Sequence, residues 1–319
     1  MTLINDIYTL VTQGARYATT PQAFQELPHF LHDLVLGSSF HAKHPHYLYT
    51  DLHAHFRKDV SMRNLIENVS ERVDILAITS RTIRSNEHHL TFEQAIQKMQ
   101  EERIAYRYLS QSDKRVAIVH GFKEPFYLVR GIEVPVKEKQ SVVMVGNRQE
   151  FKSEQLSLEE AITVSNEAGS LWFLDHPFSI YTPLISFRYP TSEELQQREE
   201  WCERYHPVLE VGNHQNTLWM YPSNIAAQIL ARKHGLTGIA NSDTHFNVGD
   251  VGRSRTVIPK DRLDVSSEQA FFDSLREVFS RLEIVRTESN YSSIWAFTQY
   301  MILPTVLSAM KLDKEVSSS

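Results

Sequence analysis

Apolar and polar stretches alternate along the chain from residue 47 onward. After YLYTDLHAH at 47–55, six more apolar runs of strand length follow, separated in several places by longer segments with helical spacing. Three residues, Thr91, Ser157 and Ser266, each stand three positions before a Gln or Glu, which is typical of a helix start. Strands that alternate with helices predict crossover connections and a parallel sheet, and seven strands in succession favour a barrel. The six later runs are VDILAITS (73–80), FYLVRGIEVPV (126–136), SVVMVGN (141–147), GSLWFLDH (169–176), PVLEVGN (207–213) and LTGIANSD (236–243).

The pattern predicts three parts of the chain. Before the first strand, apolar spacing predicts two helical segments around Leu3–Leu10 and Phe24–Leu36. We therefore expect an N-terminal helical extension at 1–47, a barrel at 48–288, and a C-terminal apolar segment with a polar tail at 289–319.

Two further stretches differ in composition from the alternating core. Ile294–Met310 is apolar but contains Thr, Gln, Pro and Ser, and it is short for a membrane span, so we expect a docking helix or a surface for homo-oligomer formation. Arg188–His206 is rich in charges and predicts an exposed helical insertion, with a functional lid as the alternative.

Composition narrows the class of protein. The net charge is −6 and no long basic run occurs, which argues against a broad nucleic-acid surface but leaves a local basic groove open. The single cysteine, Cys202, excludes an internal disulfide framework and cysteine-based zinc motifs. The N-terminal residues do not show the pattern of a signal peptide, which is a basic start followed by an apolar run. We therefore expect a cytoplasmic protein without a membrane partner.

Histidines and carboxylates stand at the ends of five predicted strands. Chemistry in parallel α/β folds collects at the carboxyl ends of the strands, so these side chains are expected to share one site. Each residue alone is equally typical of a surface histidine, a turn or a helix cap. Together, imidazole nitrogens and carboxylate oxygens predict a zinc, manganese or iron site. The residues are His53 and His55, Glu133, Asp175 and His176, Glu210 with Asn213 and His214, and Asp243 with His245.

The ordered set DLHAH, ILAIT, GIEV, DHP, EVGN and ANSDTH resembles the polymerase and histidinol phosphatase (PHP) family of metal-dependent phosphoesterases. The resemblance extends over residues 49–260 and implies a distorted seven-stranded (β/α) barrel with up to three metal ions at its mouth. It also implies that one metal ion is held by His53, His55, Glu133 and Asp243.

The chain departs from the family pattern at the other two metal positions. The resemblance implies a second metal ion on Glu133 and His176, but Val142 and Val143 stand where another histidine is usual. At the third position His245 matches, Asp59 matches weakly, and Ser80, Arg81 and Thr82 replace a histidine motif. Arginine cannot act as a metal ligand, so one or two metal ions are expected. Stand-in ligands left open are His88, His89, His120 and His214, while Asp51 and Asp175 are expected to orient ligand imidazoles.

The candidate catalytic residues are Arg81 and His245. A metal ion on two imidazoles and two carboxylates would lower the pKa of a water molecule to about 7. We hypothesise that the guanidinium of Arg81 replaces a missing cation and clamps a phosphate or carboxylate. The alternative is a salt bridge from Arg81 to Asp59 that closes a lost metal site.

The expected function is hydrolysis of a small phosphorylated metabolite or a nucleotide by metal-activated water. An oligonucleotide end is an alternative substrate, and amide hydrolysis is an alternative reaction because it uses the same nucleophile. A different class of function is a catalytically degenerate barrel that acts as a binding or scaffold protein through its C-terminal apolar segment.

Overall fold

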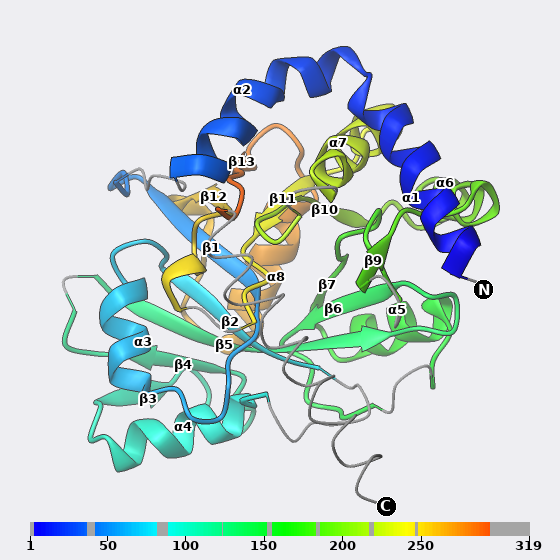
Figure 1. Ribbon diagram of the computed structural model, residues 1–319. Coiled ribbons are helices and arrows are strands. Elements are labelled where there is room, and N and C mark those ends of the chain that lie inside the picture. The colour runs from blue at the N-terminus through cyan, green and yellow to red at the C-terminus, as the bar shows by residue number, and fades with distance from the viewer. Residues whose placement is uncertain are drawn as a thin grey trace, which may run out of the picture.

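A mixed sheet of eleven strands forms the centre of the protein (Figure 1). In the computed structural model, the described residues are 3–36, 42–81, 89–122, 124–151, 155–182, 186–216, 220–245 and 248–293. The strands are β1 (Tyr47–Ala54), β2 (Ile75–Arg81), β3 (Tyr106–Tyr108), β4 (Val116–Val119), β5 (Phe126–Pro135), β6 (Ser141–Val145), β7 (Leu171–Leu174), β10 (Val208–Asn213), β11 (Gly238–Asn241), β12 (Arg255–Pro259) and β13 (Arg286–Glu288), with a separate ribbon of β8 (Ile180–Thr182) and β9 (Ser186–Arg188). The α-helices are α1 (Leu3–Ala18), α2 (Pro21–Leu36), α3 (Met62–Val69), α4 (Phe92–Glu101), α5 (Leu158–Glu167), α6 (Ser192–Tyr205), α7 (Pro222–His234) and α8 (Glu268–Phe279), and short 3-10 turns are η2 (Val248–Asp250) and η3 (Lys260–Arg262).

The sheet curls into a nearly closed barrel. Its strand order is β11-β10-β7-β6-β5-β2-β1-β12-β13, with β3 and β4 attached beside β5. The chain just after β11 meets β1 through two backbone hydrogen bonds: Asp243 N donates to His53 O and His55 N donates to Thr244 O, each at 2.7 Å. The predicted distorted α/β barrel is therefore confirmed, although the sheet contains more strands than the seven expected.

One part of the predicted parallel sheet is antiparallel. β6 runs opposite to both of its neighbours, β5 and β7. The connection from β5 to β6 is a tight turn in which Val136 N donates to Gln140 O at 2.8 Å. A turn this short cannot cross over the sheet, so the two strands must be antiparallel.

The helix starts follow the local sequence. Thr91 and Ser157 each form the predicted capping box at the start of α4 and α5. For α8 we predicted a start at Ser266, but Ser267 caps the helix instead, its Oγ accepting from Ala270 N at 3.1 Å. The difference of one residue is typical for helix boundaries inferred from sequence.

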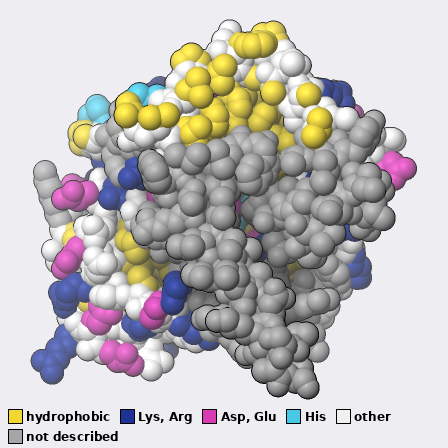
Figure 2. All heavy atoms as spheres, in the orientation of Figure 1, with side chains coloured by type: hydrophobic (Ala, Val, Ile, Leu, Met, Phe, Trp, Pro, Cys, Tyr) yellow, Lys and Arg dark blue, Asp and Glu magenta, His cyan; other side chains and the backbone are white. Residues whose placement is uncertain are grey.

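The two N-terminal helices lie along α7 at the top of the molecule in Figure 1. Phe30 of α2 stacks on Tyr221 with ring centroids 4.2 Å apart and meets Tyr291 edge-on at 5.3 Å. The outer face of α2 exposes apolar side chains, including Phe24 and Leu31, and Figure 2 shows apolar side chains gathered on that side. The predicted domain boundaries stay predictions, and Ile294–Met310 lies outside the described residues.

The charged stretch Arg188–His206 is helical, but the expectation of an exposed insertion is wrong for its inner face. Arg188, Arg198 and Trp201 are all buried. Arg188 is paired with Glu194 of the same segment at 2.7 Å. Charge count alone suggested a solvated helix, whereas these arginines point inward and bind polar groups of the protein.

Candidate metal centre

Four predicted ligands converge at the mouth of the barrel. His53 and His55 come from the end of β1, Glu133 from β5, and Asp243 from the loop after β11. The Nε2 atoms of the two histidines are 3.1 Å apart. Asp243 Oδ1 lies 3.4 and 3.5 Å from them, and Glu133 Oε2 lies 3.9 and 3.3 Å away. All four side chains thus direct a potential ligand atom at a common point.

Hydrogen bonds on the far side of each ring set this orientation. His55 Nδ1 lies 2.8 Å from the carbonyl oxygen of Thr79, which can only accept, so this nitrogen must carry the proton. His53 Nδ1 lies 3.2 Å from a carboxylate oxygen of Glu210 and donates in the same way. In their neutral forms, both rings therefore turn an Nε2 lone pair toward the other. Two lone pairs at this separation are favourable only with a proton or a metal ion between them.

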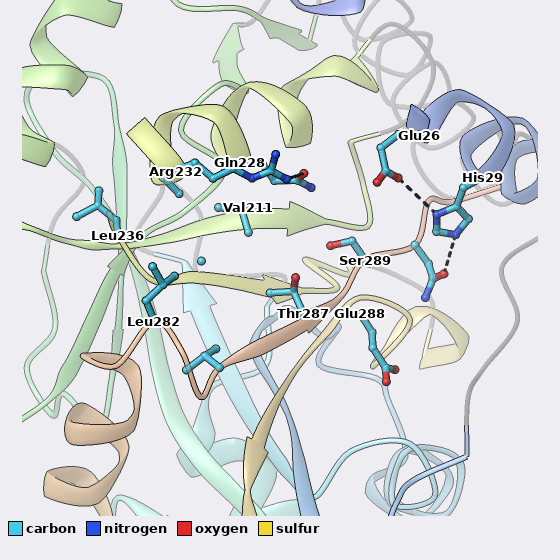
Figure 3. A pocket seen from close by; sticks show the side chains of 14 residues that line it. Glu26, His29, Val211, Gln228, Arg232, Leu236, Leu282, Thr287, Glu288 and Ser289 are labelled. Carbon is cyan, nitrogen blue, oxygen red and sulfur yellow. Dashed lines mark hydrogen bonds and ion pairs between the residues drawn. The ribbon is translucent and has the colours of Figure 1, made fainter. Parts of the chain in front are cut away.

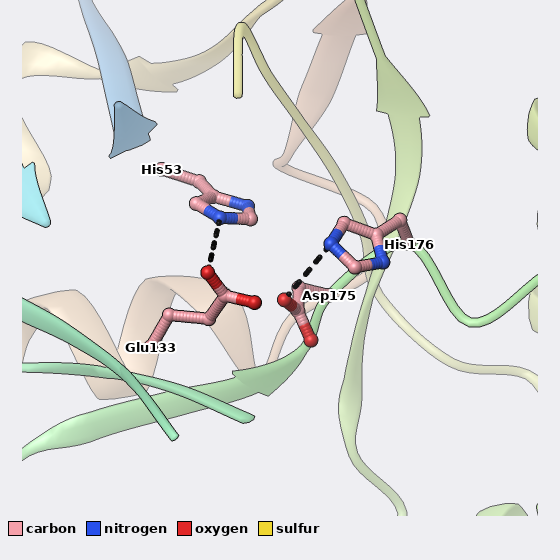
Figure 4. Close-up of side chains that lie close together, drawn as sticks. All are labelled: His53, Glu133, Asp175 and His176. Carbon is pink, nitrogen blue, oxygen red and sulfur yellow. Dashed lines mark ion pairs between the residues drawn. The ribbon is translucent and has the colours of Figure 1, made fainter. Parts of the chain in front are cut away.

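A second group of ligand atoms lies beside the first (Figure 4). It consists of His53, Glu133, Asp175 and His176, whose ligand atoms all lie within 4.8 Å of one another. Asp175 Oδ2 is 3.2 Å from His176 Nε2. Sequence reasoning gave Asp175 only an orienting role, although its place beside His176 at the end of a strand was a signal for a ligand. The carboxylate of Asp175 offers the group an oxygen where Val143, opposite Glu133 in the sheet, offers none.

The two candidate catalytic residues lie at the edge of this cluster. Arg81 Nε is 3.0 Å from Glu133 Oε2, and 18% of the Arg81 side chain is exposed. His245 Nδ1 donates to the carbonyl of Asp243 at 2.9 Å, and its ring centroid is 4.6 Å from that of His55. Asp59 is paired with Arg57 at 2.9 Å. Arg81 thus pairs with the cluster rather than forming the alternative bridge to Asp59.

The stand-in histidines differ in their positions. The ring of His89 lies 5.4 Å from the ring of His55, near the cluster. His214 is buried elsewhere and donates from Nδ1 to a backbone carbonyl at 3.1 Å. His120 is exposed, and His88 lies outside the described residues.

Burial and charge act in opposite directions on the cluster. Burial alone would lower the pKa of His53, but the carboxylates of Asp243 and Glu210 raise it well above its ordinary value. Burial would raise the pKa of Glu133, but the charge of Arg81 and hydrogen bonds from the histidines hold it well below its usual range. Burial raises the pKa of Asp175 to about 7. Neighbouring charges thus favour the ionised form of Glu133 and the protonated form of His53, while burial favours the neutral form of Asp175.

Burial also changes the pKa of His245. It lowers the pKa of His245 to about 4, despite the nearby Asp243 carboxylate. A neutral imidazole at neutral pH is the form that binds metals and accepts protons.

Several buried polar atoms of the cluster lack a hydrogen-bond partner among the described residues. Within the described part of the chain, Asp243 Oδ1, Asp175 Oδ2 and His176 Nδ1 have no hydrogen-bond partner although they are shielded from solvent. Buried polar groups are almost always satisfied, so such a concentration of unsatisfied atoms requires an explanation. Imidazole nitrogens and carboxylate oxygens are suitable ligands for zinc, manganese or iron. The residues present therefore fit a divalent metal ion.

Two members of the cluster have unusual backbone conformations. Asp243 has φ 47° and His176 has φ 22°, in the region that side chains other than glycine rarely adopt. Asp51 supports the first of these loops, because its carboxylate accepts from Ser242 N at 3.1 Å and Gly252 N at 2.9 Å. Asp51 thus shapes the loop that presents Asp243 instead of contacting an imidazole as expected. Strain of this kind persists where the surrounding structure enforces it, most often at functional sites.

Two cavities differ in their relation to the cluster. One of about 340 Å³ adjoins it and is lined by His55, Arg57, Ser61 and Asn64 among others. A cavity of about 510 Å³ lies between α2, α7 and β13 (Figure 3). Its described lining includes none of the cluster residues. The smaller cavity is therefore the one that gives space beside the cluster.

The structure combines an α/β barrel with a set of potential metal ligands at its mouth, and one part of the chain matches a known family. Residues 222–278 match the family model PHP_C, described as PHP-associated. This match confirms the resemblance to the PHP family. No curated protein matches the chain.

Solved structures with a similar arrangement come from several bacteria and an archaeon. A two-domain protein from Bacteroides vulgatus, containing a predicted PHP-like metal-dependent phosphoesterase, is 16% identical, with 78% of this chain and 68% of that chain covered and a TM-score of 0.47. PsfC from Pseudomonas syringae is 15% identical, with 83% and 99% covered and a TM-score of 0.47. The lesion-specific endonuclease PfuEndoQ from Pyrococcus furiosus is 15% identical, with 76% and 57% covered and a TM-score of 0.46.

Proposed function

We propose that the protein is a metal-dependent phosphoesterase that hydrolyses a small phosphorylated metabolite or a nucleotide. The observation that carries this proposal is the convergence of four ligand atoms, with the Nε2 atoms of His53 and His55 only 3.1 Å apart. A buried arrangement of this kind is costly for the protein unless a cation joins it.

We assign one divalent ion to His53, His55, Glu133 and Asp243. A second would use Glu133 and His176, with Asp175 as an additional oxygen ligand. Zinc, manganese and iron all suit these ligands. When bound, such an ion supplies Lewis acidity, which lowers the pKa of water and polarises a phosphoryl oxygen.

Arg81 is assigned to the substrate. Its Nε contacts Glu133, while part of the side chain reaches the solvent at the mouth. A guanidinium offers several donors in one plane, which suits it to bind the oxygens of a phosphate. Arg81 would hold the phosphate group and neutralise its charge next to the ligand cluster.

His245 is assigned a place at the same edge. Its Nδ1 donates to the Asp243 carbonyl, which leaves Nε2 with the lone pair. Because burial keeps this ring neutral at neutral pH, Nε2 can act as a further metal ligand or accept a proton.

The cavity beside His55 would accommodate the rest of the substrate. An oligonucleotide end is a related candidate, because Arg57 in the cavity wall could meet a further phosphate group. The geometry does not favour a scaffold, since Arg81 is not closed against Asp59. We place the enzyme in the cytoplasm, as the buried free thiol of Cys202 is consistent with a reducing compartment. Within the described residues, no helix has both the length and the apolar character to cross a membrane.

The first experiment measures metal content per chain on protein purified without chelator, together with Asp243→Ala and the exposed control Asp261→Ala. We expect at least one equivalent in wild type and in Asp261→Ala, and less than half an equivalent in Asp243→Ala. A phosphomonoester and phosphodiester screen with zinc, manganese and iron then tests turnover. Protein that binds no metal after reconstitution, or that binds metal without hydrolysing any phosphoester, would contradict the proposal.

A further inference from the structure

The loop that presents His176 is held at three successive carbonyl groups. The carbonyl of His176 accepts from Ser179 N at 2.8 Å. That of Pro177 accepts from Arg198 Nε at 2.6 Å, and that of Phe178 accepts from Ser223 Oγ at 3.3 Å. The central bond differs from the other two, because its donor is a charged group from α6.

Burial of the charged Arg198 side chain is unfavourable for stability. The side chain is 0% exposed, and its hydrogen bonds go to two neutral carbonyls, those of Pro177 and, at 2.7 Å, Glu194. The carboxylate of Glu194 is instead bound on both oxygens by Arg188, each at 2.7 Å. A buried cation without a carboxylate bound to it costs stability, so packing of α6 alone does not account for Arg198.

The backbone beside this bond is strained. His176 has φ 22°, outside the well-populated regions for a residue with a side chain. Its amide donates to Glu210 Oε2 at 2.9 Å, so the residue is held from the N-terminal side as well. A charged donor makes a stronger hydrogen bond to a carbonyl than a neutral donor does. Arg198 and Glu210 therefore hold the strained residue between two fixed peptide groups.

We propose that Arg198 is a positioning residue for metal binding: by holding the carbonyl of Pro177 it fixes His176 in the orientation in which its imidazole joins the ligand cluster. This inference rests on the proposed function, in which His176 is a metal ligand. It gives the charged segment Arg188–His206 a role in the metal centre that neither a solvated face nor a lid would have.

Arg188 offers a matched control for the test. It is a second buried arginine of the same segment, and it binds Glu194 and its neighbour's carbonyl instead of Pro177. We would compare wild type, Arg198→Met, Arg198→Lys and Arg188→Met. The dissociation constants for Zn²⁺ and Mn²⁺ would be measured by competition with a chelating dye, and the visible spectrum of the Co²⁺-loaded protein would report the coordination geometry.

Loss of an interaction that orients a metal ligand typically weakens metal binding by about 10- to 100-fold. We therefore expect Arg198→Met to weaken the binding of one metal ion by at least about 10-fold and to change the Co²⁺ spectrum. Arg198→Lys, which retains a charged donor, should recover part of the affinity. Arg188→Met should lower stability while keeping the wild-type affinity and spectrum.

Equal metal affinity and identical spectra in wild type and Arg198→Met would overturn the inference and leave the proposed function intact. If Arg198→Met does not fold, Arg198→Lys provides the test. The charged donor of lysine lies at a different place from that of arginine, so wild-type metal affinity in Arg198→Lys would also contradict the positioning role. A wild-type protein that binds no metal would overturn the proposed function together with this inference.

Discussion

Two buried charge clusters in this protein are built in opposite ways. Glu268, at the start of α8, is 1% exposed and accepts from Arg115 Nε at 2.6 Å and from the backbone amides of Arg115 and Val116 at 2.9 and 3.2 Å. At the barrel mouth, the carboxylates of Asp243 and Glu133 are also buried and face the Nε2 atoms of His53 and His55 at 3.3 to 3.9 Å, and Asp243 Oδ1 has no hydrogen-bond partner within the described residues. The first cluster is complete within the chain, whereas the second is the one that we propose a cation completes.

The difference separates a structural site from a functional one without reference to residue type. Both clusters contain carboxylates and basic groups, so composition does not distinguish them. Hydrogen bonding does distinguish them, because a buried group without a hydrogen-bond partner costs free energy, and such atoms of Asp243, Asp175 and His176 lie together in the second cluster. The same comparison predicts how substitutions in the two clusters should differ.

The largest effect is expected at the complete cluster. Replacement of Glu268 by Ala leaves the buried guanidinium of Arg115 unpaired and should lower the free energy of unfolding by about 3 to 5 kcal/mol. Urea denaturation followed by circular dichroism would measure the loss. Metal affinity of the folded fraction should stay within about twofold of wild type. A loss below about 1 kcal/mol would show that the two clusters are not energetically different.

At the incomplete cluster, Asp243→Asn should reverse this pattern. Removing a ligand charge should weaken metal binding by more than about 100-fold, beyond the loss typical of a residue that only orients a ligand. Asn tolerates the left-handed backbone of this position, so the metal-free variant should still fold, with a smaller loss in free energy of unfolding than Glu268→Ala. Isothermal titration with Zn²⁺ and urea denaturation in chelator would test both halves, and wild-type affinity would rule out Asp243 as a ligand.

A substitution of Arg81 should affect catalysis without affecting metal binding. Arg81→Ala removes the group assigned to the phosphate and should lower kcat/KM by about 100-fold, as expected for loss of a donor that stabilises developing charge. Metal content should remain at the wild-type level. Steady-state kinetics alongside metal analysis would show this, and activity that survives the substitution would exclude the clamp.

The smallest effect concerns Glu194, a satisfied carboxylate in α6. Although burial alone would raise its pKa, hydrogen bonds from Arg188 and Thr191 lower it to about 2, compared with an ordinary value of 4.5. A lowered pKa stabilises the fold above pH 4.5, and this contribution is lost as the pH falls toward 2. Glu194→Gln should therefore be less stable than wild type by about 1 to 2 kcal/mol at pH 7. The difference should shrink below pH 4.5 in parallel urea titrations, and a constant difference would contradict the assignment.

Much of the fold was predictable because strand and helix periods are local. The i and i+2 spacing of His53 and His55 predicted their shared face, and the position of Asp243 at a strand end predicted its place at the mouth. The antiparallel direction of β6 was not predicted, since it depends on the length of a turn inside an unbroken apolar pattern. The role of the charges on α6 was not predicted either, because a sequence shows how many charges a segment has but not which carbonyl each one reaches.

The seam between β1 and the chain after β11 has a consequence for folding. The backbone bonds that close it involve His53, His55 and Asp243 themselves, so opening the barrel there separates the proposed ligands. Assembly of the site and closure of the barrel are then one event. An ion bound to residues on both sides of this seam would stabilise the closed barrel. The amide protons of His55 and Asp243 should therefore exchange with solvent more slowly in its presence.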